Sequence, residues 1–257
     1  MRAPPPASAN PAFLIAAGLI ALHGARAWLD GEAQMRLLRA IAFVPARLWA
    51  ALSPDWTGER LAAAPREAAR IAAYWLADGP APWSALSYAL IHAGWGHALS
   101  NAALLALFGA PVARRMGTSR FVGLLALGAV AGAGAQMCAA EGAFAPLVGA
   151  SASVCAAIGA LARMRAAPGG PLAGPARGEG RDGFAAALRR PQALAALAGG
   201  VAVMLTGGLA GDEMSAIGWR AHLGGFLAGF VVGARGRKTE PPQACRSRRT
   251  EASSESD

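Results

Sequence analysis

The amino-acid sequence predicts an all-α membrane protein, a bundle of six transmembrane helices with a long amphipathic first loop. Charged residues make up only 15% of the 257-residue chain, whereas about 25% is usual in soluble domains. Apolar residues gather into six runs of roughly 20 residues, the length that crosses a hydrocarbon core of ~30 Å. Positive charge alternates between successive connections, as it does when helices cross a membrane in alternating directions.

The six apolar runs are rich in alanine and glycine, so the helices that they form can pack closely. They are predicted at 12–29, 84–110, 120–140, 146–164, 186–206 and 214–234. Together they define one six-span domain over 12–235. The proline-rich residues 1–11 and the polar residues 236–257 are predicted to be disordered tails, because neither stretch can bury a core.

Charged residues predict which side of the membrane each connection faces. Arginines cluster after the second, fourth and sixth runs, whereas the opposite connections carry Glu141 and the pair Asp212 and Glu213. Because positive loops stay in the cytoplasm, both termini are predicted to be cytoplasmic and residues 30–83 periplasmic. The net charge of +9 therefore reflects topology. We expect no nucleic-acid binding, since no basic face is interleaved with base-stacking aromatic residues.

The first run has an alternative interpretation as a cleaved signal peptide. Residues 12–22 are apolar and precede Ala25-Arg26-Ala27, which resembles an A-x-A cleavage site. However, only Arg2 supplies positive charge before the run, and Arg26 is unusual inside a cleavage site. Removal of the run would also leave five spans and disturb the alternation of charge. We therefore expect a retained first helix.

The connection 30–83 contains too many apolar and aromatic residues for an unstructured loop. Two amphipathic helices are predicted, around 33–52 and 58–77. Tryptophans such as Trp49 and Trp75 suit the membrane–water interface, where aromatic rings concentrate. We therefore expect this connection to lie on the lipid bilayer.

Polar residues inside apolar runs are costly in a bilayer and indicate function. Ser151 follows Gly149 where a loop turns into the fourth run, so we expect it at a helix N-terminus, where unpaired N–H groups favour negative charge. A helix-capping serine is the alternative. His222 is a suitable proton acceptor, and the spacing of Gly225 and Gly229 lets its helix pack tightly. No acidic residue falls clearly inside a run, which favours a Ser–His dyad over a triad.

Three more polar residues lie in the second run. His97 and Asn101 are four residues apart and share one helix face, where both can donate hydrogen bonds to a developing oxyanion. His92 lies five residues before His97. A zinc site formed by His92, His97 and His222 would have neither an H-E-x-x-H motif nor an acidic partner, so we expect no metal and no cofactor.

Together these motifs resemble those of rhomboid intramembrane serine proteases. They lie within about residues 30–234 and read His92-x4-His97-x3-Asn101, Gly149-Ala150-Ser151 and Ala221-His222-x2-Gly225-x3-Gly229. The resemblance implies that Ser151 is the nucleophile and His222 the general base and acid. It implies oxyanion donation by His97, Asn101 and the Ser151 N–H, with His92 in support. The implied activity is endopeptidase cleavage of single-span transmembrane substrates near the outer leaflet, by a multi-pass protein of a bacterial inner membrane.

Two positions depart from the family pattern. Ala152 replaces the last glycine of G-x-S-G, and one added methyl group could crowd the helix beside the nucleophile, because tightly packed interiors respond to small changes in volume. Cys155 stands where an aromatic residue often packs on the base. Ser153 is a weaker nucleophile candidate, ~200° around the helix from Ser151. The departures leave a catalytically inactive relative that binds transmembrane helices as the alternative function. A transporter or proton relay would need inverted repeats or broken helices, which we do not find in the sequence.

Overall fold

The computed structural model describes residues 10–138, 144–166 and 218–233. Within these ranges the secondary structure is helical, apart from one isolated β-bridge between Phe43 and Leu147. The prediction of an all-α protein is therefore confirmed. The fifth run predicted at 186–206, the acidic connections and the predicted tail at 236–257 lie outside the described residues.

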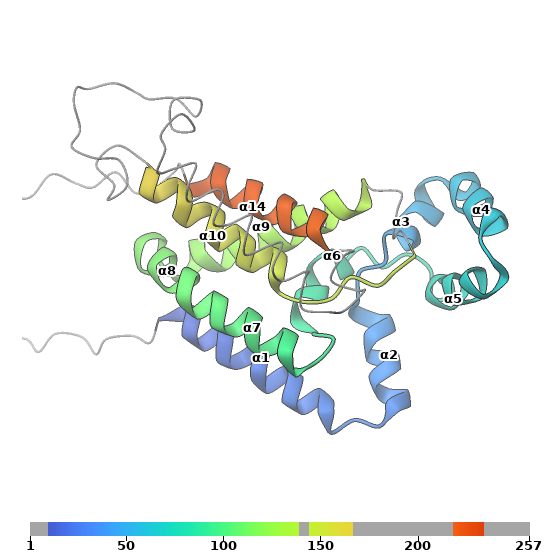
Figure 1. Cartoon of the computed structure of the whole chain (residues 1–257), viewed down its shortest axis with the longest axis horizontal. Helices are drawn as coiled ribbons and strands as arrows, with labels where there is room; N and C mark the ends of the chain where they lie inside the picture. The colour runs from blue at the N-terminus through green and yellow to red at the C-terminus, as the bar shows by residue number, and fades with distance from the viewer. Residues whose placement is uncertain (1–9, 139–143, 167–217, 234–257) are drawn as a thin grey trace, which may run out of the picture.

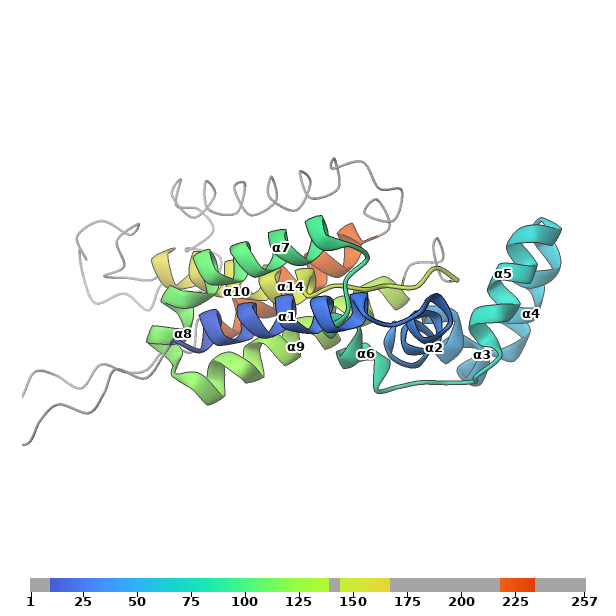
Figure 2. The same ribbon diagram turned by 90° about the horizontal axis from the view of Figure 1, so that it is seen from below.

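The bundle is built from helices that run side by side in Figures 1 and 2. They are α1 (Pro11–Ala27), α7 (Trp95–Leu104), α8 (Ala110–Met116), α9 (Thr118–Met137), α10 (Ser151–Ala166) and α14 (Trp219–Val232). A wider π-helical turn, η2 (Leu105–Gly109), joins α7 to α8. Helices α9, α10 and α14 pack against one another, and α1 packs against α7.

Two helical rods are long and apolar enough to cross a membrane, as judged by length and composition. They are Trp95–Met116 and Thr118–Met137, and the apolar helices α1 and α10 are shorter. The rods agree with a membrane protein. The total of six spans stays a prediction.

The helix that corresponds to the second predicted run begins at Trp95, later than the sequence predicted. The run at 84–110 contains a short helix, α6 (Ser84–Ser87), a 3-10 turn, η1 (Tyr88–Leu90), and a non-helical stretch before Trp95. Hydropathy alone cannot separate these elements from one helix, because all of them are apolar. The rod then continues to the end of α8, beyond the predicted boundary. Pro111 has no N–H to bond back four residues, which accounts for the widened turn before it.

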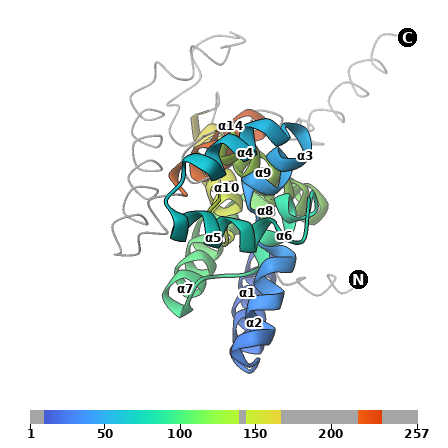
Figure 3. The ribbon, with the colours of Figure 1, turned by 90° about the vertical axis from the view of Figure 1, so that its right-hand side faces the viewer.

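Residues 30–83, here named the outer segment, form four main helices where two were predicted. These are α2 (Gly31–Ile41), α3 (Pro45–Leu52), α4 (Pro54–Ala63) and α5 (Arg66–Leu76). Proline starts α3 and α4, and Pro65 precedes α5. A proline suits a first helical turn but not a helix interior, so it divides each predicted helix. The outer segment lies beyond one end of the bundle, the end that Figure 3 faces.

Small residues bring the central helices into backbone contact. A Cβ atom on Gly225 or Gly229 of α14 would overlap the carbonyl oxygen of Ala152 or Ala156 of α10, respectively. On α9, a Cβ atom on Gly132 would lie 2.6 Å from the Ala152 Cβ. The predicted close packing of these helices is thus present, and it fixes how α14 sits on α10.

Candidate active site

The side chains of Ser151 and His222 are within hydrogen-bond distance. The Ser151 Oγ and the His222 Nε2 are 2.7 Å apart. Ser151 is the first residue of α10, and His222 lies in the first turn of α14. Both residues are partly buried. A hydroxyl this close to an imidazole can transfer its proton during nucleophilic attack.

Helix packing determines that contact. Gly225 meets the backbone of Ala152, the residue after Ser151, and lies three residues beyond His222. Gly229 meets Ala156 one turn further along both helices. Because these contacts are between backbones, they leave little freedom for α14 to slide along α10. The same register therefore brings the imidazole to the hydroxyl.

Hydrogen bonds from earlier parts of the chain hold the Ser151 loop (residues 144–150). The Phe43 N–H donates to the Leu147 carbonyl (3.1 Å), and the Leu147 N–H donates to the Phe43 carbonyl (2.7 Å). The Gly149 N–H donates to the Tyr88 carbonyl (2.9 Å). The Ala150 N–H donates to the His92 Nε2 (3.3 Å). The backbone that leads into Ser151 is therefore tied at three positions.

His97 lies directly against the Ser151 loop. A Cβ atom on Gly149 would be 2.5 Å from its Cε1 and 2.7 Å from its Nε2. Gly149 also has a φ of +111°, which favours glycine. The His97 ring meets the His92 ring edge-on, with centroids 5.1 Å apart. The loop glycine thus leaves space for an imidazole beside the N-terminus of α10.

Asn101 is buried one helical turn beyond His97. Its Nδ2 donates to the His97 carbonyl (2.8 Å), within its own helix. The described residues show no hydrogen bond between its side chain and the Ser151 loop. An amide nitrogen carries two hydrogens, so one N–H stays available for a second acceptor.

The two departures from the family pattern are both buried. The Ala152 methyl group occupies the space that Gly132 of α9 leaves open. Cys155 lies in the core of the bundle. The rival nucleophile Ser153 donates its hydroxyl to the Leu125 carbonyl of α9 (2.8 Å). That bond directs Ser153 towards α9.

Two buried residues near the site were not identified from the sequence. Tyr88 packs in one cluster with Ala152 and Ala221, the neighbours of the candidate dyad, and its hydroxyl donates to the Ala129 carbonyl (2.9 Å). His23 of α1 lies near His92, with ring centroids 6.4 Å apart. A signal for His23 was present, because it is an ionisable residue inside an apolar run. Tyr88 had no comparable signal.

The outer segment has its own polar support. Arg47 is buried and donates to the carbonyls of Gly79 (2.6 Å) and Arg39 (2.7 Å), and burial lowers the pKa of its guanidinium. Arg39 forms two hydrogen bonds to the Asp78 carboxylate (2.8 and 2.5 Å). These contacts join α2 and α3 to the turn after α5.

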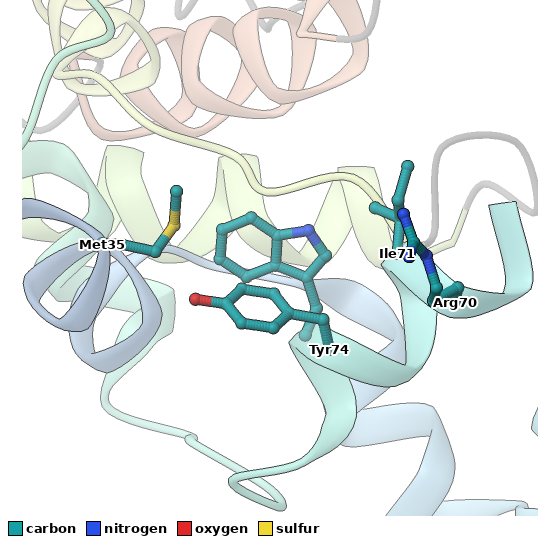
Figure 4. Close-up of a pocket in the computed structure, with 5 residues that line it drawn as sticks. Met35, Arg70, Ile71 and Tyr74 are labelled. Carbon is teal, nitrogen blue, oxygen red and sulfur yellow. The ribbon is translucent and has the colours of Figure 1, made fainter. Parts of the chain in front are cut away.

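A pocket in the outer segment is separate from the candidate dyad. Figure 4 shows its lining, which comes from α2 and α5. The lining residues are Met35, Arg70, Ile71, Tyr74 and Trp75. None of them belongs to the helices that carry Ser151 and His222. Within the described ranges, no three His, Cys, Asp or Glu side chains are grouped to hold a metal ion.

Comparison with known proteins identifies the family. The sequence matches the family described as Rhomboid domain over residues 80–239, which is more than half of the chain. The matched region extends from just before α6 to beyond α14, so it includes Ser151 and His222. No curated protein and no solved structure gives a significant match. The chain belongs to the rhomboid family.

Proposed function

We propose that the protein is an intramembrane serine endopeptidase in which Ser151 and His222 form a catalytic dyad. The observation that carries this proposal is the 2.7 Å separation of the Ser151 Oγ and the His222 Nε2. The rhomboid family assignment and the apolar rods support cleavage of a substrate within or near the bilayer. The substrate class is a single-span transmembrane protein.

The chemistry begins with attack of the Ser151 oxygen on a peptide carbonyl, while the His222 Nε2 takes the hydroxyl proton. The same nitrogen then returns the proton to the leaving amine, and an activated water releases the acyl-enzyme. The His222 Nδ1 is buried and has no hydrogen-bond partner among the described residues. This arrangement favours a dyad over a carboxylate-assisted triad.

The oxyanion is stabilised at the N-terminus of α10. The Ser151 N–H and the His97 ring are suitably located donors, since His97 lies against Gly149. The second N–H of Asn101 is the third donor. His92 supports the site because its Nε2 accepts a hydrogen bond from the Ala150 N–H.

The buried Ala152 does not favour an inactive relative, because Gly132 accommodates its methyl group. The proposed setting is a multi-pass protein of a bacterial inner membrane with both termini in the cytoplasm. The outer segment then faces the periplasm and lies on the bilayer surface. Trp83, the last residue of the outer segment, and Trp28, just before its start, are mostly exposed, as expected for rings at a membrane interface. Trp75, which the sequence predicted at that interface, is instead buried against Val44 and Ala46 within the outer segment.

The experiment uses the full-length protein in detergent and in liposomes. A serine-directed fluorophosphonate probe and a panel of single-span model substrates are applied to wild type and to Ser151→Ala. Ser153→Ala is the matched control, because it removes a neighbouring hydroxyl from the same helix. We expect wild type and Ser153→Ala to be labelled and to cleave, and Ser151→Ala to do neither.

Two outcomes would contradict the proposal. Cleavage by Ser151→Ala, with loss of cleavage by Ser153→Ala, would show that Ser153 and not Ser151 is the nucleophile. A folded wild-type protein that resists labelling and binds the substrates without cutting them would identify the inactive relative.

A further inference from the structure

All four histidines of the chain lie in one part of the bundle. His222 contacts Ser151, and His97 lies against Gly149. The His92 ring is 5.1 Å from that of His97 and 6.4 Å from that of His23, measured between centroids. The four histidines therefore lie in a row that extends from α14 to α1. The proposed chemistry gives no role to His23.

The hydrogen bond to the Ser151 loop fixes the tautomer of His92. The Ala150 N–H donates to the His92 Nε2, so that nitrogen carries no proton. A neutral imidazole with an unprotonated Nε2 carries its proton on Nδ1. The His92 Nδ1 is buried, and no described protein group accepts a hydrogen bond from it. An unsatisfied buried donor is costly, so this N–H needs an acceptor.

His23 presents a matching group on α1. It is 4% exposed, and its ring packs edge-on against Trp95 with centroids 4.7 Å apart. Its Nδ1 is buried without a hydrogen-bond partner in the described ranges, as is the Nε of Arg26, three residues along the same helix. Several unpaired polar atoms in one buried place are the usual setting for a bound water molecule.

We propose that His23 is a positioning residue that acts on the Ser151 loop through His92 and one bound water. The water accepts a hydrogen bond from the His92 Nδ1–H and donates one to the His23 Nδ1. His92 is thereby held in the tautomer that accepts the Ala150 N–H, and the backbone before Ser151 stays in place. The effect on turnover rests on the proposed protease function, whereas the two tautomers do not.

The direct test is nitrogen NMR of the full-length protein with ¹⁵N-labelled histidine, at a pH where the imidazoles are neutral. Four histidines give few signals, and single substitutions assign them. We expect opposite tautomers, with the proton on Nδ1 in His92 and on Nε2 in His23. His23→Phe should shift the His92 signals, whereas His23→Asn, which keeps a polar group for the water, should restore them.

Turnover gives the second readout. We expect His23→Phe to lower kcat roughly 3- to 10-fold, the effect of losing one hydrogen-bonded support, with KM nearly unchanged. His23→Asn should recover kcat to within about twofold of wild type. Leu19→Ala is the matched control, because Leu19 is buried one turn earlier on the same face of α1. It should lower Tm and leave both kcat and the His92 signals unchanged.

Several results would overturn the inference. One is a wild-type His92 with its proton on Nε2. Another is His23→Phe with unchanged His92 signals and unchanged kcat. A third is Leu19→Ala with the same loss of kcat and the same spectral change, which would indicate loose packing. A wild type that cleaves nothing would instead count against the proposed function, and the tautomers would still decide the role of His23.

Discussion

The body of α10 and the Ser151 loop that precedes it are held in place by different kinds of contact. Along the body of α10, Gly225 and Gly229 of α14 meet its backbone with no intervening side chain. Before its first residue, the Ser151 loop is held by hydrogen bonds to Phe43, Tyr88 and His92. The first region sets the register of two helices by steric contact. The second sets the direction of a short backbone segment by polar contact.

This difference predicts two kinds of variant. Damage to the helix contact should prevent the bundle from folding, because a displaced backbone cannot be repaired locally. Damage to the loop should leave the bundle folded and slow the reaction, because small displacements of reacting groups are costly in rate.

The largest effect is expected from Gly229→Val. Its side chain would overlap the Ala156 carbonyl oxygen, so we expect a loss of about 3 kcal/mol or more in the free energy of unfolding. Thermal unfolding in detergent measures this loss. Gly123→Ala on α9 is the control, because a Cβ atom there has no neighbour within 4 Å. A Gly229→Val protein with the Tm of wild type would contradict the backbone contact.

The next effect concerns the loop. Gly149→Ala places a Cβ atom against the His97 ring at a φ that disfavours alanine, so we expect kcat to fall roughly 10²-fold. The far-UV circular dichroism spectrum should stay that of wild type. Gly94→Ala is the matched control, since Gly94 is extended and its Cβ position is open. Equal activity in the two variants would argue against the loop geometry.

Tyr88 contacts both regions: its carbonyl accepts a hydrogen bond from the Gly149 N–H of the Ser151 loop, and its ring packs beside Ala152 and Ala221. Two substitutions of Tyr88 therefore distinguish an effect on stability from an effect on kcat. Tyr88→Phe loses one hydrogen bond to Ala129 and should lower the free energy of unfolding by about 1 kcal/mol, with kcat unchanged. Tyr88→Leu removes the ring beside Ala152 and Ala221 and should lower kcat roughly 10-fold. Phe121→Leu, at a buried aromatic in another part of the core, should affect Tm alone. If Phe121→Leu also lowers kcat, the loss in Tyr88→Leu reflects general loosening of the core and not the contact of the Tyr88 ring with Ala152 and Ala221.

The smallest effect is expected at Ala152. If the Ala152 methyl group crowds the helix beside the nucleophile, Ala152→Gly should speed the reaction. Since Gly132 already accommodates the methyl group, we now expect no faster labelling by a fluorophosphonate. The variant should instead lose roughly 0.5–1 kcal/mol of stability, because glycine is the weaker helix former. A faster variant would restore the crowding hypothesis.

The sequence predicted the helix contact better than the loop. Small residues four positions apart, such as Gly225 and Gly229, leave a readable pattern on a helix. The pairing of Ser151 with His222 followed from residue chemistry and resemblance. By contrast, Phe43 and Tyr88 hold the loop through backbone atoms, which every residue has. Hydrogen bonds of this kind have no signature in the amino-acid sequence.

The predicted helix boundaries were wrong for a related reason. The stretch that contains Tyr88 and His92 is as apolar as the helix after it, so hydropathy merged them into one run. In the outer segment, the helix breaks at Pro45 and Pro65 were visible as prolines, and a stricter use of that signal would have predicted them. His23 could also have been found, as the one histidine of the first run.

The most direct test of the account is a double-mutant comparison of Ser151 and His222 on one single-span substrate. We expect Ser151→Ala and His222→Ala each to reduce cleavage to near background, and the double variant to be little worse than either, because the two groups act as one unit. All three proteins should keep the Tm of wild type within a few degrees. Substantial cleavage by either single variant, or losses that multiply in the double variant, would contradict the dyad.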